Sequence, residues 1–258
     1  MEYISDSYYI LAFLIIASFC AGFIDSIAGG GGFILVPALM LAGLSPTMAV
    51  ATNKLPAVFG TAAAAYNFIR SKTVIWPVAL IGLVCAFLGG MAGSHINLGV
   101  SQDTLNKIVL FILPVAAIVT FIPKKNLKHN VKDFSKKELY IAAPVISFIL
   151  GIYDGFFGPG MGTFLIIAFY SIIGMNMVQA SAVSKIVNFA SGAGALVMFL
   201  KAGQVIIVIG IPLLIANVLG SYIGSKMAIK NGQAFVKKIL IIVFIVMFIS
   251  LIIKIIKG

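Results

Sequence analysis

The 258-residue sequence has few charged side chains: Asp, Glu, Lys and Arg together make up 10 % of it. A soluble domain averages about 25 %. Hydrophobic residues instead reach 61 %, and the mean hydropathy is +1.15. No soluble core of this length could hide so much apolar surface, so lipid must be the solvent for much of the chain. The composition therefore argues against an aqueous enzyme or a nucleic-acid-binding protein, and no nucleic-acid partner is expected.

Histidine, cysteine and acidic residues are also scarce, with two, two and seven copies respectively. His95 and His129 fall in predicted loops, and no cluster of His, Cys and acids offers metal ligands. No serine–histidine arrangement inside a span and no paired acidic motif indicates a membrane enzyme. A P-loop for ATP is missing too, which argues against direct ATP coupling. We therefore expect no enzyme, no catalytic residue, no cofactor and no metal.

What the sequence does contain is long apolar runs, and they predict an all-α integral membrane protein. They cover roughly 8–28, 33–44, 46–69, 74–93, 104–122, 139–157, 162–174, 177–200, 204–225 and 235–256. Most approach the ~20 residues that cross about 30 Å of hydrocarbon. The segments 33–44 and 162–174 are too short and follow glycine-rich stretches, so we expect half-helices, re-entrant segments or parts of broken helices. Acidic residues precede the first run and a basic n-region does not, which favours a true span over a signal peptide.

One stretch is clearly aqueous, and it divides the chain nearly in half. Residues 123–138 hold six lysines against two acids. Positive loops remain on the cytoplasmic side, so this stretch is predicted to be a basic cytoplasmic linker. Docking to anionic lipid headgroups is a further option for it. The predicted organisation is a first transmembrane repeat over 1–122 and a second over 139–258.

An internal repeat supports this division. In the first half an aspartate, a glycine cluster and a lysine follow one another, and the same order returns in the second half. The matching stretches are Gly22–Asp25 with Gly151–Asp154, Gly29–Phe33 with Gly158–Gly162, and Ala49–Lys54 with Ala180–Lys185. The aspartates are 154 − 25 = 129 residues apart and the lysines 185 − 54 = 131, so a two-residue insertion separates the registers. Chance recurrence of low-complexity apolar sequence does not explain this order.

The number of crossings depends on what the short segments do. If they are re-entrant, each half crosses four times, which gives about eight full spans in parallel halves. If they cross, the chain has ten helices as 5+5 inverted repeats. Counting lysines and arginines in the loops does not choose between the two.

Four ionisable residues lie within the apolar pattern: Asp25, Lys54, Asp154 and Lys185. Each such group costs at least about 2.5–3.5 kcal/mol near the bilayer centre. They therefore need partners, a wet cavity or a function. Structural salt bridges within or across the repeats are one interpretation. The other is a central site, because duplicated transporters bind substrate at the repeat interface.

The glycine clusters strengthen the second interpretation. Glycine permits positive φ and close approach, and a helix that begins inside the membrane offers free N–H groups and the positive end of its dipole. Two such ends beside two lysines would bind an anion without a metal. Asn53 and Ser184 precede the lysines at matching positions. The predicted substrate-binding residues are Lys54, Lys185, Asn53, Ser184, Gly30, Gly31, Gly32, Gly160 and Gly162, and the predicted proton-coupling residues are Asp25 and Asp154.

These motifs resemble a known family. The stretch from Ala21 to Lys54 resembles the first repeat of the sulfite exporter TauE/SafE family, and the stretch from Gly151 to Lys185 is similar to its second repeat. The resemblance covers nearly the whole chain, and its motifs are specific to the family but not to a substrate. It implies a multi-pass permease of the prokaryotic cell membrane that exports sulfite, sulfonates or related anions with the proton gradient.

The predicted function is therefore a secondary transporter for a small anion, a sulfite-like oxyanion or sulfonate, working by proton-coupled alternating access. The alternatives are a passive anion channel and a transporter for another small organic anion. The expected partners are the anion, protons and the lipid bilayer. The particular anion and the oligomeric state stay open, with a homodimer among the options.

Overall fold

The structure is a computed structural model that describes residues 2–105 and 138–257, with side chains described for 8–105, 139–232 and 235. The predicted span 104–122 and the predicted linker 123–138 lie almost entirely outside the described residues. Within the described ranges every regular element is a helix. Five stretches are long and apolar enough to cross a membrane: Tyr8–Ala28, Trp76–Gly99, Leu139–Phe156, Met177–Lys201 and Ile207–Gly232.

The helices follow most of the predicted apolar runs, but α4 continues beyond the predicted end at 93, and the predicted runs 204–225 and 235–256 both fall within α9. Those before the undescribed segment are α1 (Glu2–Ala28), α2 (Gly32–Leu41), α3 (Pro46–Arg70) and α4 (Trp76–Gly99). Those after it are η1 (Glu138–Ala142), α6 (Ala143–Phe156), α7 (Met161–Ala168), η2 (Phe169–Ile173), α8 (Met177–Lys201) and α9 (Ile207–Lys257). α9 is broken at Gly232, where φ is 69° and ψ is −158°. Helix α2 has 10 residues and α7 has 8, about 15 and 12 Å at 1.5 Å per residue, so neither crosses about 30 Å alone.

Two of the long helices begin with a polar cap. The Ser45 side chain accepts the N–H of Met48 at the start of α3. At the start of α8, Asn176 accepts the N–H groups of Val178 and Gln179, and the Gln179 side chain accepts the Asn176 N–H in return. Such caps satisfy amides that a helix start leaves without an intrahelical partner.

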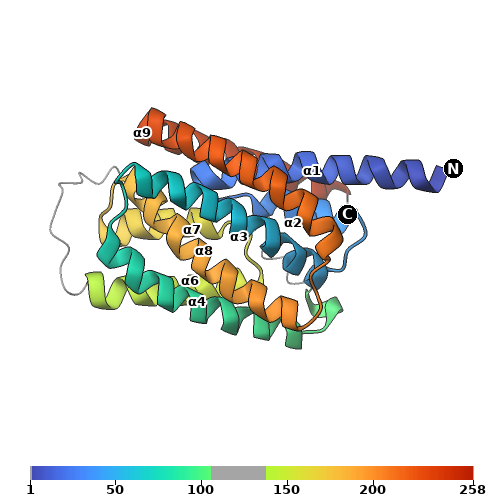
Figure 1. Ribbon diagram of the computed structural model, residues 1–258, viewed down its shortest axis with the longest axis horizontal. Coiled ribbons are helices and arrows are strands. Elements are labelled where there is room, and N and C mark those ends of the chain that lie inside the picture. The colour runs from blue at the N-terminus through green and yellow to red at the C-terminus, as the bar shows by residue number, and fades with distance from the viewer. Residues whose placement is uncertain (1, 106–137, 258) are drawn as a thin grey trace.

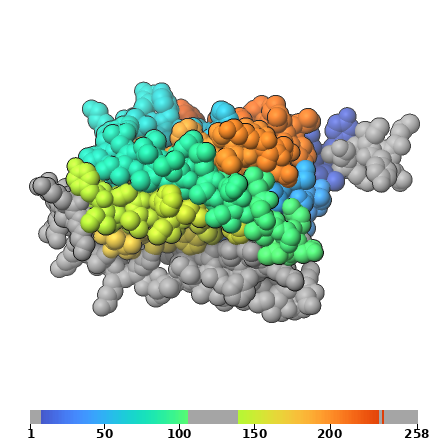
Figure 2. All heavy atoms as spheres, turned by 90° about the horizontal axis from the view of Figure 1, so that it is seen from below, coloured from blue at the N-terminus to red at the C-terminus, as the bar shows by residue number. Residues whose placement is uncertain are grey.

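The helices interlock across the middle of the chain (Figure 1). α9 packs mainly on α1 and α3, whereas α4 packs mainly on α6 and α8. α3 and α8 contact each other between these two groups. The space-filling view shows α4 and α6 as adjoining bands along one face (Figure 2). Helices on opposite sides of the undescribed segment therefore form most of the contacts.

α1, α3 and the first part of α9 run in the same direction. Contacts between α1 and α9 advance together along both helices, as Ser18–Leu213, Gly22–Ser221 and Ser26–Gly224. Contacts between α3 and α9 do likewise, from Thr52–Ile206 to Asn67–Ser225. These three helices thus form one parallel group.

α4, α6 and α8 form a second parallel group. The contacts of α4 with α6 advance as Gly82–Ser147, Gly89–Gly151 and Gly93–Phe156, and those with α8 as Gly82–Val187 and Gly90–Ser191. This second group runs opposite to the first, because Gln102, just beyond the end of α4, donates to Thr47 at the start of α3 over 2.9 Å. α1 and α6, the first described long helices of the two halves, therefore point in opposite directions.

Close packing depends on glycine at the helix crossings. A Cβ on Gly93 would collide with the carbonyl oxygen of Ile152, and one on Gly90 with that of Ser191. Small residues allow membrane helices to approach in this way. Gly89, Gly90 and Gly93 therefore serve packing. Of the long helices described before the undescribed segment, α3 is the most polar in composition. Many of its residues are buried against other helices.

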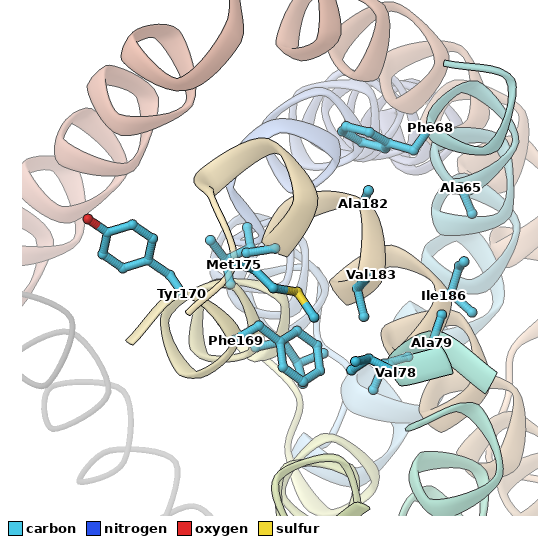
Figure 3. Packing of buried hydrophobic residues seen from close by; sticks show 14 of the residues in the cluster. Ala65, Phe68, Val78, Ala79, Phe169, Tyr170, Met175, Ala182, Val183 and Ile186 are labelled. Atoms are coloured by element: carbon cyan, nitrogen blue, oxygen red, sulfur yellow. The ribbon is translucent and has the colours of Figure 1, made fainter. Parts of the chain in front are cut away.

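The main apolar core lies where α3, α4, α7, η2 and α8 meet. Phe68 and Phe169 are fully buried in it. Figure 3 shows the Phe169 ring toward Val78 and Val183, and the Phe68 ring on the other side of Ala182. This packing fixes the position of α8. It thereby also holds Lys185, the buried lysine of α8, in place.

Candidate functional site

Lys54 of α3 is buried and forms an ion pair with Asp154 of α6. Its Nζ lies 2.7 Å from Asp154 Oδ1 and 2.6 Å from the Asp154 backbone oxygen. The exposed fractions of the two side chains are 3 % and 5 %. The second carboxylate oxygen, Oδ2, accepts the hydroxyl of Ser191 over 2.7 Å. The charge of this carboxylate is therefore fully compensated inside the protein.

Lys185 of α8 pairs with Asp25 of α1 in a looser arrangement. Its Nζ lies 3.7 Å from Asp25 Oδ2 and also donates to the Asp25 backbone oxygen. Lys185 is completely buried, but 22 % of the Asp25 side chain is exposed. Asp25 Oδ1 accepts the Gly31 N–H at 3.3 Å. The same two groups of the aspartate, its carboxylate and its backbone carbonyl, thus hold a lysine in both pairs.

The pairing is crosswise. The aspartate that precedes the undescribed segment pairs with the lysine that follows it, and the reverse holds for the other pair. Each pair places two opposite charges where neither could stay alone, since removing one partner of a buried ion pair costs about 3–5 kcal/mol. The sequence had left open whether salt bridges would form within or across the halves. In the structure they form across them.

The two glycine clusters meet beside these pairs. The Thr163 N–H donates to the Gly29 carbonyl over 2.9 Å, and the Thr163 hydroxyl donates to the Ala28 carbonyl over 2.9 Å. Gly29 and Gly158 both have positive φ, 75° and 93°, at the ends of α1 and α6. A Cβ on Gly158 would lie 2.7 Å from Lys54 Nζ, and one on Gly162 would lie 2.7 Å from Gly29 Cα. Glycine is thus needed for both the turn and the contact.

The predicted helix ends lie at this meeting point, but several of their N–H groups already have partners. Gly31 donates to Asp25, Thr163 donates to Gly29, and Phe33 donates to the Gly30 carbonyl. Gly32 packs on Pro159, and Gly160, with φ 85°, packs on the Phe33 ring. An anion at these helix ends would therefore compete with protein carbonyls and with Asp25. The structure brings the predicted glycines together without leaving all their donors free.

Asn53 and Ser184 differ in their surroundings. Ser184 is buried and donates to the Ser181 carbonyl of its own helix over 2.8 Å. Asn53 is 6 % exposed, and its side chain makes no hydrogen bond to another described residue. The Asn53 amide therefore retains hydrogen-bonding capacity beside Lys54. Thr52, its other neighbour, is used to cap α9 through the Ile206 N–H.

The sequence interpretation missed two residues that shape the site. Ser191 binds Asp154, but in the sequence it stands in a run of small residues typical of helix packing. The Tyr153 hydroxyl donates to the Pro159 carbonyl over 2.6 Å, and its ring meets Phe157 and Phe164 edge to face. Helical spacing of three residues from Asn188, itself three residues from Lys185, was the available signal for Ser191. Tyr153 offered only its place next to Asp154.

The fold and the buried charges define a multi-pass helical membrane protein with an ion-paired polar centre. Membrane transporters carry intramembrane charges of this kind. The model of the family described as sulfite exporter TauE/SafE matches residues 14–251. The chain belongs to this family of membrane transporters.

Bacterial relatives agree with this assignment. The chain is 35 % identical over 241 residues to the "Probable membrane transporter protein YfcA" of Escherichia coli, covering 92 % of this chain and 88 % of that protein. It is 36 % identical over 249 residues to the "Probable membrane transporter protein ORF9" of Sinorhizobium sp, covering 95 % and 93 %. A "Probable membrane transporter protein" of Haemophilus influenzae is 33 % identical over 243 residues, covering 92 % of both. No solved structure matches the chain significantly.

Proposed function

We propose that the protein is a secondary transporter that exports a small sulfur-containing anion, a sulfite-like oxyanion or sulfonate, with proton coupling. The observation that carries the proposal is the pairing of each buried lysine with a buried aspartate from the other half. The choice of anion rests on the family to which the chain belongs.

The ion pair supplies a physical basis for coupling. While an aspartate is ionised, it occupies its lysine, and an arriving anion would be repelled. Protonation of the aspartate removes that negative charge and leaves the lysine ammonium free for the anion. Proton and anion therefore bind together, and each raises the affinity for the other by the same factor. For a monovalent anion the joint step is electroneutral, so the membrane potential neither drives nor opposes it. Export of the anion together with a proton then requires that the outward gradient of the anion exceed the inward gradient of the proton.

We infer that the two halves are inverted copies, as the 5+5 interpretation of the sequence proposes. Two observations support this inference. α1 and α6 run in opposite directions, and α4 and α9 each pack mainly on helices of the other half. Inverted halves allow two conformations of comparable energy that open the same central site to opposite sides. Alternating access then requires that at least one of the two ion-paired ends rearranges.

The charge distribution supports an orientation for this arrangement. The ends of α3 and of the first part of α9 lie side by side, because Asn67 contacts Tyr222 and Ser225. Positively charged residues gather at this end of the molecule, namely Arg70, Lys72, Lys226 and Lys230. We assign this end to the cytoplasm, where basic residues are retained.

The test is transport in proteoliposomes that contain the purified protein and radiolabelled sulfite. A pH difference across the membrane should move sulfite against its concentration gradient, which a passive channel cannot do. Lys54→Ala and Lys185→Ala should each abolish this flux, with Lys201→Ala, an exposed lysine at the end of α8, as the matched control. Unchanged sulfite flux in both buried-lysine variants would overturn the proposal. Sulfate, thiosulfate and a small sulfonate, tested in the same way, establish the substrate class.

A further inference from the structure

The two ion pairs are unequal. Asp154 has both carboxylate oxygens in short bonds, 2.7 Å to Lys54 and 2.7 Å to Ser191. Among the described residues, the Asp25 carboxylate has a 3.7 Å contact with Lys185 and a 3.3 Å hydrogen bond from the Gly31 N–H, while the Lys185 hydrogen bond goes to the Asp25 backbone oxygen. A contact of 3.7 Å exceeds the length of a hydrogen bond. The Asp25 carboxylate is thus held more weakly than the Asp154 carboxylate.

Access to solvent differs in the same direction. The Asp25 side chain is 22 % exposed and that of Asp154 is 5 % exposed. A proton can reach a carboxylate only through water or a chain of polar groups. Protonating Asp154 would also break two charge-assisted bonds, which are about twice as strong as neutral ones. Protonating Asp25 would weaken only the longer contacts of its carboxylate, at 3.7 Å and 3.3 Å.

The turns that follow the two aspartates differ as well. After Asp154 the turn contains Pro159, whose φ is fixed by its ring and whose carbonyl accepts the Tyr153 hydroxyl at 2.6 Å. After Asp25 the chain turns through Gly29–Gly31 between α1 and α2, and these glycines have no side chains to anchor the turn, which is held by the Thr163 N–H at the Gly29 carbonyl. Glycines in succession allow the backbone more conformations than a turn that contains proline. The Asp25 turn is therefore the one suited to rearrange.

The charged surroundings of Asp25 are simple. Lys185 of α8 is the charged partner that faces it. Helices α2 and α7, which adjoin its turn, contain no ionisable residue. In α3, Lys54 is engaged by Asp154. In α9, Lys226 lies 4.2 Å from the Tyr222 ring centroid, beyond Gly224, which lies beside Ser26. Lys185 is therefore the charged group that the protonation state of Asp25 affects most directly.

We propose that Asp25 is the carboxylate that gains and loses the proton during transport, while Asp154 and Lys54 remain a permanent ion pair that joins the two halves. This inference rests on the proposed function and divides its two aspartates into different roles. Asp25 takes a proton from water on the side to which the site is open, and the Lys185 ammonium then takes the substrate anion as its counter-ion. Loss of the proton restores the Asp25–Lys185 pair and expels the anion.

A spectroscopic test of this division does not depend on the substrate. Infrared difference spectra of the purified protein between acidic and alkaline buffer report the C=O bands of protonated carboxyl groups, and subtracting each variant's spectrum from that of the wild type isolates the band of a single aspartate. This band should be lost in Asp25→Asn, shift in the conservative variant Asp25→Glu, and persist in Ser191→Ala, which loosens only the Asp154 pair. A band that survives in Asp25→Asn would overturn the proposal. So would a band that is lost in a folded Asp154→Asn protein.

Transport gives the second test. In proteoliposomes, Asp25→Asn should lose accumulation of sulfite driven by a pH difference but keep exchange of labelled for unlabelled sulfite, since its neutral amide mimics the protonated acid. Pumping that persists in Asp25→Asn would also overturn the proposal. If the wild-type protein exchanges no sulfite while the infrared band behaves as expected, the substrate assignment fails and the role of Asp25 stands.

Discussion

Lys54 and Asp154 are 100 residues apart in the sequence, and in the structure their side chains lie 2.7 Å apart. Each comes from a different half of the chain, and a second pair, Lys185 with Asp25, repeats the relationship in reverse over 160 residues. The ion pairs therefore connect the halves as well as placing charge in the membrane.

The Lys54–Asp154 pair should follow the energetics of a buried ion pair. Lys54→Met or Asp154→Leu alone should lower stability by about 3–5 kcal/mol, because the remaining charge has no buried counter-ion. The double variant should regain most of that stability, since an apolar pair of similar volume replaces the charges. Thermal unfolding in detergent measures all three proteins. A double variant as unstable as the sum of the single ones would contradict the ion-pair interpretation.

Gly158 should tolerate no side chain. Gly158→Ala adds a Cβ about 2.7 Å from Lys54 Nζ at a φ of 93°, so it should cost strain of about 1–3 kcal/mol and also displace the lysine. The control is Gly203→Ala, where φ is 66° and no atom lies within 4 Å of the added Cβ. Both variants should melt at lower temperature, but only Gly158→Ala should lose sulfite transport. Equal loss of transport in both would show that backbone strain alone is responsible.

Asn53 should contact the substrate, and Ser184 should not. Asn53→Ala removes an amide that has no partner among the described residues, so it should leave the melting temperature nearly unchanged. It should raise the KM for the transported anion by up to about tenfold, the value of one lost hydrogen bond. Ser184→Ala removes a bond to its own helix and should leave the KM unchanged. A shifted KM for Ser184→Ala alone would reverse the assignment.

Helix packing between α4 and α6 should be sensitive to a single methyl group. At Gly93 an added Cβ would collide with the Ile152 carbonyl, whereas at Gly99 it would meet no atom within 4 Å. Gly93→Ala should therefore cost about 1–3 kcal/mol, while Gly99→Ala should cost almost nothing. With about 2–4 °C of melting temperature per kcal/mol for a chain of this size, the difference is measurable by thermal unfolding.

The two halves should not fold separately. α4 packs on α6 and α8, and α9 packs on α1 and α3, so each half alone would expose the surfaces that the other covers. A chain divided within 123–138 should yield a stable complex when both parts are co-expressed, and each part expressed alone should be degraded. Co-purification through a tag on one part measures assembly. A stable isolated half would argue against the interlocked arrangement.

Much of the secondary structure could be predicted from the sequence. The segment 46–69 is α3 at Pro46–Arg70, and the glycine clusters do precede two short helices. The predicted segment 74–93 was too short, because α4 continues to Gly99. Polar residues near its end suggested a loop, but Asn97 is buried and donates to the Phe156 carbonyl over 2.7 Å. A hydropathy pattern does not indicate whether a polar side chain forms a hydrogen bond with a neighbouring helix.

The charged residues of the site could be predicted from the sequence, but their ion-pair and hydrogen-bond partners could not. The cost of burying charge singled out Asp25, Lys54, Asp154 and Lys185 from the sequence alone. Ser191 escaped notice because serine among glycines and alanines is also typical of plain helix packing. The inequality of the two ion pairs depends on that serine and on one tyrosine–proline hydrogen bond. Neither is implied by any pattern of residue types.

The sequence by itself determined that the chain lies in a membrane, that two short helices follow glycine clusters, and that four costly charges sit among apolar residues. These properties depend on composition and local order, because solvation by lipid and helix formation are decided within about 20 residues. Which aspartate meets which lysine depends on contacts over 100 and 160 residues. Only the crossing of the helices decides such contacts. The tertiary structure therefore decided that the charges pair crosswise, and that one pair is closed while the other stays partly open.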